Sequence, residues 1–188
     1  APNGDMWALG ISKRQLLHFP KGDWNNGRIV CEGDSAEPCK SFTAPFHLAI
    51  DQQDRIWVSD SSFHVIRFPA ADPGKAVKFE VRSNNSGLNI DSQGNVWVTN
   101  RFGPGLIGMA HMVDMAVHLK TGGVLSASDY LTKTMSEQKG GSGSVTLLRP
   151  DGTQFPGTPF RGGGLPGPWA VVVDGNDNVW VSNFAMAS

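Results

Sequence analysis

One segment of the chain occurs three times without gaps, at residues 45–60, 85–100 and 168–183. Each copy places an aspartate six residues before a tryptophan, in the pairs Asp51–Trp57, Asp91–Trp97 and Asp174–Trp180. The first ten residues read as the back half of a fourth copy, ending on Trp7. A fold for this chain must therefore provide the same local structure several times over.

Each copy is typical of a β-hairpin. A short apolar run leads into the aspartate, a turn follows, and an alternating strand then carries the tryptophan. The third residue after the aspartate is Asp54, Gly94 or Asp177, and these residue types tolerate the left-handed backbone of a tight turn. Because tryptophan brings the largest apolar surface to the buried face, we expect the four repeated tryptophans to pack between sheets.

A third strand ending in proline also recurs, at 15–20, 64–69 and 145–150. Successive repeat tryptophans are 50, 40 and 83 residues apart, and a base period near 40 is that of a four-stranded propeller blade. A solenoid of β-turn units is the alternative, but its repeats are usually shorter. The predicted fold is all-β: an incomplete β-propeller over residues 1–188 with about three four-stranded antiparallel blades.

Two segments interrupt the period. The longer, about 103–143, falls between the second and third strands of the third blade, and its apolar residues recur at helical spacing, which predicts a part-helical insertion. The shorter, about 27–42, is a polar loop with two cysteines. Long loops on a rigid scaffold often carry function, and both are expected on the same rim of the propeller.

Cys31 and Cys39 are the only cysteines in the chain. A disulfide across so short a loop is sterically easy and would imply an oxidising, secreted or periplasmic compartment. Two free thiols are the alternative. A zinc site is disfavoured, because there is neither a C-x-x-C motif nor a nearby histidine pair.

The bulk composition narrows the function classes. A formal net charge of −1 provides no electrostatic footprint for nucleic acid, and no apolar run approaches the roughly 20 residues of a membrane span. Charged residues make up only 18% of the chain, while 23 glycines and 12 prolines favour many turns. Motifs for a serine nucleophile elbow, a phosphate loop and an H-E-x-x-H zinc site are all missing.

Candidate site residues gather where inner strands begin and second strands end. His47, whose counterparts in the other copies are Gly87 and Ala170, is a candidate general base. The candidate ligand-binding residues at the same rim are Asn85, Arg101 and Trp169.

Three residues directly after the W-V-[S/T] strands could form an oxygen-rich ring for calcium or magnesium: Asp60, Asn100 and Asn183. The alternative is that these side chains cap the strand ends by bonding nearby backbone. Repetition at one position in every copy favours the capping interpretation, because structural requirements repeat and catalytic ones usually do not.

The pattern D-x-x-G-N-x-W-V-[S/T]-N resembles NHL repeats and the streptogramin-lyase-like (virginiamycin B lyase-like) propellers. The resemblance covers nearly the whole chain outside the two insertions and implies a fragment of a larger secreted propeller. In the lyases it would call for a Glu-x-His pair with magnesium, yet no glutamate here precedes a histidine by two residues.

The expected function is therefore a secreted scaffold or binding module, with no catalytic activity evident. Its expected partners are the remaining blades and an unknown ligand or protein on the loop-bearing rim. A divalent-metal-assisted lyase or lactonase, with its site at the mouth of the central channel, is the alternative.

Overall fold

Each repeat folds into an antiparallel sheet that begins with its inner strand. The computed structural model describes residues 1–188 except 62, 82–84, 102–142, 166 and 184–188. Within them, twelve strands form four sheets, all with antiparallel neighbours. The predicted helix of the 103–143 insertion lies outside the described residues.

The first sheet contains β1 (Met6–Gly10), β2 (Gln15–Phe19) and β3 (Arg28–Glu32), and the second contains β4 (Pro45–Ile50), β5 (Arg55–Asp60), β6 (His64–Pro69) and β7 (Val77–Glu80). The third contains β8 (Asn85–Ile90), β9 (Val96–Asn100) and β10 (Ser144–Leu148), and the fourth β11 (Pro168–Val173) and β12 (Val179–Asn183). Three short 3₁₀ helices lie in the connections: η1 (Pro20–Gly22), η2 (Trp24–Asn26) and η3 (Cys39–Ser41).

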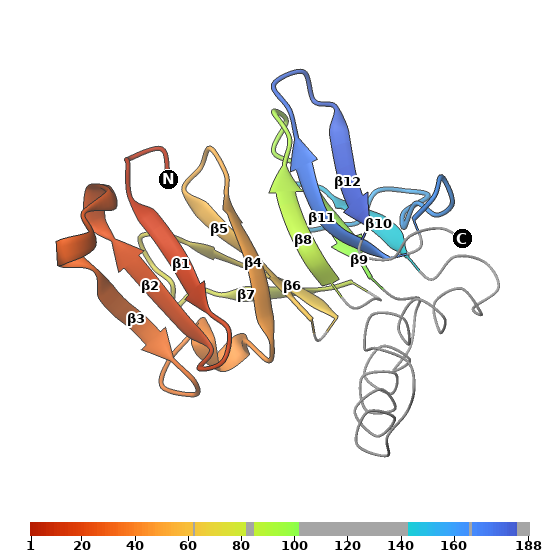
Figure 1. The fold of residues 1–188 in the computed structure, drawn as a ribbon. Helices are drawn as coiled ribbons and strands as arrows, with labels where there is room; N and C mark the ends of the chain where they lie inside the picture. Colours follow the sequence, from red (N-terminus) through yellow and green to blue (C-terminus); the bar gives the residue numbers. More distant parts are fainter. Residues whose placement is uncertain (62, 82–84, 102–142, 166, 184–188) are drawn as a thin grey trace, which may run out of the picture.

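The sheets follow one another as the blades of a partial β-propeller (Figure 1). The turns after β4, β8 and β11 point to one end, at the top of the view. We call this the turn end. The opposite end, where β4, β8 and β11 begin and β5, β9 and β12 finish, is called the channel rim. The fold predicted from the repeat is confirmed.

Alternating side chains of one strand serve two different interfaces. Ile56 and Val58 of β5 belong to the apolar cluster between the first and second sheets. Trp57, between them in sequence, belongs to the cluster between the second and third sheets and is fully buried. This use of both faces is what a radial stack of sheets requires.

The tryptophans differ in how far they are covered. Trp57 is fully buried, and Trp7 packs partly buried against the first cluster. Trp97 stacks on Phe160 at 6.1 Å between ring centroids. Trp180, in contrast, is 66% exposed, so the expected inter-sheet packing is wrong for this residue. The reason is that no further described sheet covers its face of β12.

The third sheet has no complete fourth strand at its outer edge among the described residues, only a segment that forms two isolated bridges with β10. Residues 154–160 pair with β10 only through the bridges Val145–Phe160 and Leu148–Gln154. Phe160 N donates to Val145 O at 2.8 Å, and Val145 N donates back at 3.0 Å. The predicted four strands are therefore three strands and a bridged segment.

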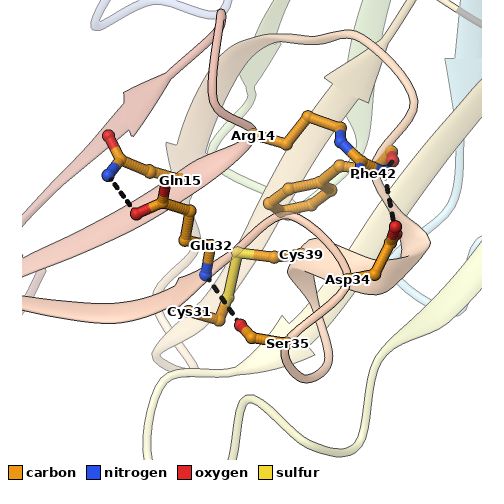
Figure 2. The surroundings of a disulfide bond; sticks show 8 residues. All are labelled: Arg14, Gln15, Cys31, Glu32, Asp34, Ser35, Cys39 and Phe42. Atoms are coloured by element: carbon orange, nitrogen blue, oxygen red, sulfur yellow. Dashed lines mark hydrogen bonds and ion pairs between the residues drawn. A yellow bond between two sulfur atoms is a disulfide. The ribbon is translucent and has the colours of Figure 1, made fainter.

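The cysteine segment is shorter as a loop than predicted, because residues 28–32 form β3, the outer strand of the first sheet. Cys31 of β3 and Cys39 of η3 form a disulfide (Figure 2). Arg14 holds the other side of the loop, with Nη1 3.0 Å from Phe42 O and 3.1 Å from Asp34 Oδ1. The disulfide thus fastens the first sheet to the connection that leads into β4.

A search of the described residues finds no helix with the length and apolar character to cross a membrane.

Candidate binding site at the channel rim

Strand register brings the predicted rim residues together. Pro45 pairs with Asp60, Asn85 with Asn100, and Pro168 with Asn183, at the same position of three successive sheets. The starts of inner strands and the ends of second strands therefore share one edge, as the repeat predicts.

Arg101 is the centre of a contact among three sheets. Its guanidinium carbon lies 5.0 Å from the ring centroid of Phe46 and 4.7 Å from that of Trp169. The two rings meet edge to face, with centroids 5.3 Å apart. Such cation–π contacts hold the guanidinium in place. We call Phe46, Arg101 and Trp169 the rim cluster.

Electrostatics of the rim cluster follow from its partial burial. Desolvation lowers the pKa of Arg101 from its ordinary value, but a guanidinium remains charged at neutral pH. Nη2 of Arg101 also donates to Oγ of Ser61 at 3.3 Å. The rim cluster therefore presents a fixed positive charge framed by two aromatic rings.

Asn85 makes hydrogen bonds between the second and third sheets, next to the rim cluster. Its side chain is fully buried, and Nδ2 donates to the carbonyl oxygens of Asp60 at 3.3 Å and His64 at 3.0 Å. Ser61 Oγ donates in turn to Asn85 O at 3.1 Å. The structure thus places Asn85 as a brace between the second and third sheets, next to the rim cluster.

His47 bridges two inner strands. Its Nδ1 accepts a hydrogen bond from the backbone N–H of Leu88 at 3.0 Å, so β4 is joined to β8. The side chain is exposed on its other side, yet desolvation where it faces β8 lowers its pKa. Protonation at Nδ1 would break the bond to Leu88.

Gly87 occupies the position of His47 in the next sheet. There it allows two inner strands to come close together instead of separating them. A Cβ there would lie 2.7 Å from Ala170 Cα and 2.9 Å from Trp169 O. The backbones of β8 and β11 therefore touch where β4 and β8 are spaced by an imidazole. This difference explains why a histidine stands at this position in one copy and a glycine in the next.

The three side chains of the predicted metal ring make backbone and side-chain hydrogen bonds. Both carboxylate oxygens of Asp60 accept from amides, of Thr43 at 2.7 Å and Ala44 at 3.1 Å. Asn100 Nδ2 donates to the hydroxyls of Ser144 and Thr146, and Asn183 Nδ2 donates to Gly164 O. The backbone contacts of Asp60 and Asn183 match the capping interpretation, whereas Asn100 bonds side-chain hydroxyls instead of backbone. A metal ion at this ring stays a prediction.

The sequence analysis missed a set of hydrogen bonds at the same edge, in which side-chain hydroxyls join neighbouring sheets. Ser59 Oγ donates to Ser86 O at 2.5 Å, and Thr99 Oγ1 donates to Trp169 O at 3.0 Å. In both cases the serine or threonine of W-V-[S/T] bonds the second residue of the next inner strand. The repeated hydroxyl was the available signal, whereas nothing periodic marks the rim cluster.

A comparison with one solved structure supports the fold. The WD40 β-propeller domain of Doa1 is similar, with a TM-score of 0.55 at 8% identity, covering 97% of this chain and 44% of that one. The extracellular domain of BT4673 from B. thetaiotaomicron aligns with a TM-score of 0.47 at 15% identity, covering 95% of this chain and 21% of that one.

No protein-family profile matches the chain, and no curated protein does either. The chain spans less than half the length of either solved structure. At such low identity the first likeness shows a β-propeller fold and nothing of its activity.

Proposed function

We propose that the chain is a secreted propeller scaffold or binding module whose partner docks on the channel rim. The observation that carries this proposal is the rim cluster, in which residues of three sheets converge on one guanidinium. Tryptophan and arginine are enriched among the residues that dominate binding energy at protein interfaces. Each member of the cluster is half-buried, so it combines a fixed position with remaining accessible surface.

An oxidising compartment is supported by the disulfide between Cys31 and Cys39. Such bonds persist in secreted and periplasmic proteins and are rare in the cytosol.

The fourth sheet supports a second part of the proposal, that further blades of a longer protein complete the ring. Val172 is 55% exposed and Trp180 66% exposed, so this sheet carries large apolar side chains in water. A neighbouring blade would cover Trp180 as the third sheet covers Trp57.

The rim proposal is tested with peptide ligands selected from a displayed library on the wild-type protein. Affinities are then measured calorimetrically for Arg101→Ala, Trp169→Ala and the control Arg149→Ala. Arg149 stacks on Phe155 at 4.4 Å, so the control removes a similar contact away from the rim. We expect at least about tenfold weaker binding for the two rim variants, equivalent to 1.4 kcal/mol. Selected peptides that bind all variants equally would contradict the proposal.

A metal-assisted lyase or lactonase is the second candidate, and one observation favours it. Oδ1 of Asn85 and Oδ1 of Asn100 are buried acceptors without a hydrogen-bond partner among the described residues. Amide oxygens of this kind are calcium ligands. Calcium titration of the wild type and Asn100→Leu tests it, since a rim site requires calcium binding that the variant loses.

A further inference from the structure

The first and the last of the four sheets each have one face that no other described sheet covers (Figure 1). In the fourth sheet it is the face of the repeat tryptophan, where Val172 pairs with Trp180. These two side chains are 55% and 66% exposed, whereas Val171, which points to the other face, is buried. We call the face of a sheet that carries its repeat tryptophan the tryptophan face, and the opposite one the reverse face.

The first sheet leaves its reverse face uncovered by a described sheet instead. Trp7 packs against the apolar cluster shared with the second sheet, so the alternate positions of β1 and β2 point away from that sheet. Beside them, Trp24 stacks on Phe19 with ring centroids 4.7 Å apart and is 67% exposed. Strand register brings five apolar residues together on this reverse face: Met6, Ala8, Leu17, Phe19 and Ile29.

The second sheet shows the same face when a neighbouring sheet covers it. Met6 of the first sheet is 38% exposed, and Ile29 is 55% exposed. Exposed apolar patches of this kind are typical of an interaction site. In the second sheet, the residues at the positions of Met6, Ala8, Leu17 and Phe19 are all fully buried: Ile56, Val58, Ile66 and Phe68.

The contact between the second and third sheets shows which two kinds of face fit together. Trp57 and Val65 of the second sheet share one apolar cluster with Val96 and Val98 of the third. Val96 and Val98 flank Trp97 in β9, so they belong to the reverse face of the third sheet. The first and second sheets also meet with a tryptophan face on a reverse face. The two uncovered faces are thus the complementary halves of a contact that the chain already makes twice.

We propose that two copies of this chain close one ring, in which the tryptophan face of each fourth sheet packs on the reverse face of the other copy's first sheet. A second copy fits both ends at once, because each chain carries both halves of the contact and a twofold axis makes the two contacts identical. Two copies supply eight sheets, within the four to eight blades of typical propellers. No residue named on either face is charged, so burying these faces removes no ion from water.

This inference concerns residues 1–188 on their own, where a second copy takes the place of the further blades that the proposed function assigns to a longer protein. It is independent of the rim proposal, because Phe46, Arg101 and Trp169 lie on neither uncovered face. A wild-type chain that stays monomeric yet binds the peptides selected for the rim would therefore overturn the dimer alone.

Sedimentation equilibrium of the wild-type chain over a range of concentrations tests the proposal. We expect a species with the mass of two chains, in reversible exchange with the single chain. A single chain at every concentration would overturn the proposal. An open series of larger oligomers would overturn it too, because contact between these faces without closure builds filaments instead of a ring.

Two charged substitutions, Val172→Lys on the fourth sheet and Ile29→Glu on the first, test which surfaces meet. Both side chains are more than half exposed in the single chain, so the substitutions leave the fold intact, which circular dichroism checks. Each should weaken dimerisation at least about tenfold, because a charge would be buried without a partner. Val77→Lys is the matched control, since Val77 is 44% exposed in β7 of the second sheet and lies on neither face. Wild-type dimerisation in Val172→Lys or Ile29→Glu would refute the assignment.

An equimolar mixture of these two variants separates the proposed ring from a dimer in which two tryptophan faces meet. In the mixed ring one contact has no substitution, and the other sets the introduced lysine against the introduced glutamate. We therefore expect dimers with one chain of each kind, detected by a mass tag on one variant. If two tryptophan faces packed together, Ile29→Glu alone would dimerise like the wild type and mixing would restore nothing, which would contradict the proposal.

Discussion

Oδ2 of Asp51 accepts a hydrogen bond from the indole Nε1 of Trp57 at 2.9 Å. The other oxygen, Oδ1, accepts from the backbone amides of Gln53 and Arg55 and so closes the turn between β4 and β5. One carboxylate therefore shapes the hairpin and orients the indole that fills the next interface. This double role explains the six-residue spacing of the repeat.

Asp51→Ala should destabilise the fold by about 3 kcal/mol, because it removes these bonds and leaves the buried Trp57 N–H unpaired. Urea denaturation measures the loss. Asp174→Ala is the control, since Asp174 makes the corresponding bond to the exposed Trp180. Its effect should be clearly smaller, and equal losses would show that the buried indole contact contributes nothing.

Asp174 should titrate far below an ordinary aspartate. Hydrogen bonds from the Asn178 side chain, from Trp180 Nε1 and from two backbone amides lower its pKa from 3.8 to about 2. The stabilisation of the fourth hairpin is present above pH 3.8 and is lost as the pH falls toward 2. Carbon-13 titration of the carboxyl group measures the midpoint.

Asn178→Ala should raise this midpoint more than Trp180→Phe does, because the Asn178 side chain makes the largest contribution. A wild-type midpoint near 3.8 would contradict the hydrogen-bond arrangement of the repeat.

His47 should make the protein less stable in mild acid. Its pKa is lowered in the folded state, so below pH 6.5 the unfolded chain takes up a proton that the folded chain disfavours. Stability therefore falls as the pH drops from 6.5 through the folded pKa. His47→Asn keeps an acceptor for the Leu88 amide without an ionisable group. Denaturation at pH 7.5 and 5.5 should show a smaller loss in this variant, and an identical loss would exclude His47 as the cause.

Gly87→Ala should cost about 2–3 kcal/mol, because the new Cβ would meet the backbone of β11 at 2.7–2.9 Å. The matched control is Gly175→Ala, where no atom lies within 4 Å of an added Cβ. Thermal denaturation compares the two. If both variants kept wild-type stability, β8 and β11 would not be in contact.

Much of the fold was predictable because the repeat encodes it locally. The aspartate, the left-handed turn residue and the alternating strand each indicate the same hairpin, and their period predicts the blades of a propeller. The position of β3 escaped prediction because Arg28–Glu32 has charged ends and a cysteine where a clear alternation is needed. The exposure of Trp180 was not predicted, because the repeat implies a neighbouring sheet without showing that the described residues provide one.

The candidate sites were less predictable for a physical reason. The rim cluster joins residues from three sheets, and the position of Arg101 between two rings depends on how the sheets are placed around the axis. The difference between the first two sheets also depends on strand register, which places His18 opposite Trp7 and Arg67 opposite Trp57. Both features consist of residues that differ between the repeats, whereas the sequence pattern shows only the residues that the repeats share.

A crystal structure of the chain tests the central claim, that the sheets stand radially with the repeat tryptophans between them. We predict that it shows the Trp57 indole enclosed between the second and third sheets and bonded to Asp51. An indole of Trp57 in solvent, or two flat layers of parallel sheets, would contradict the account.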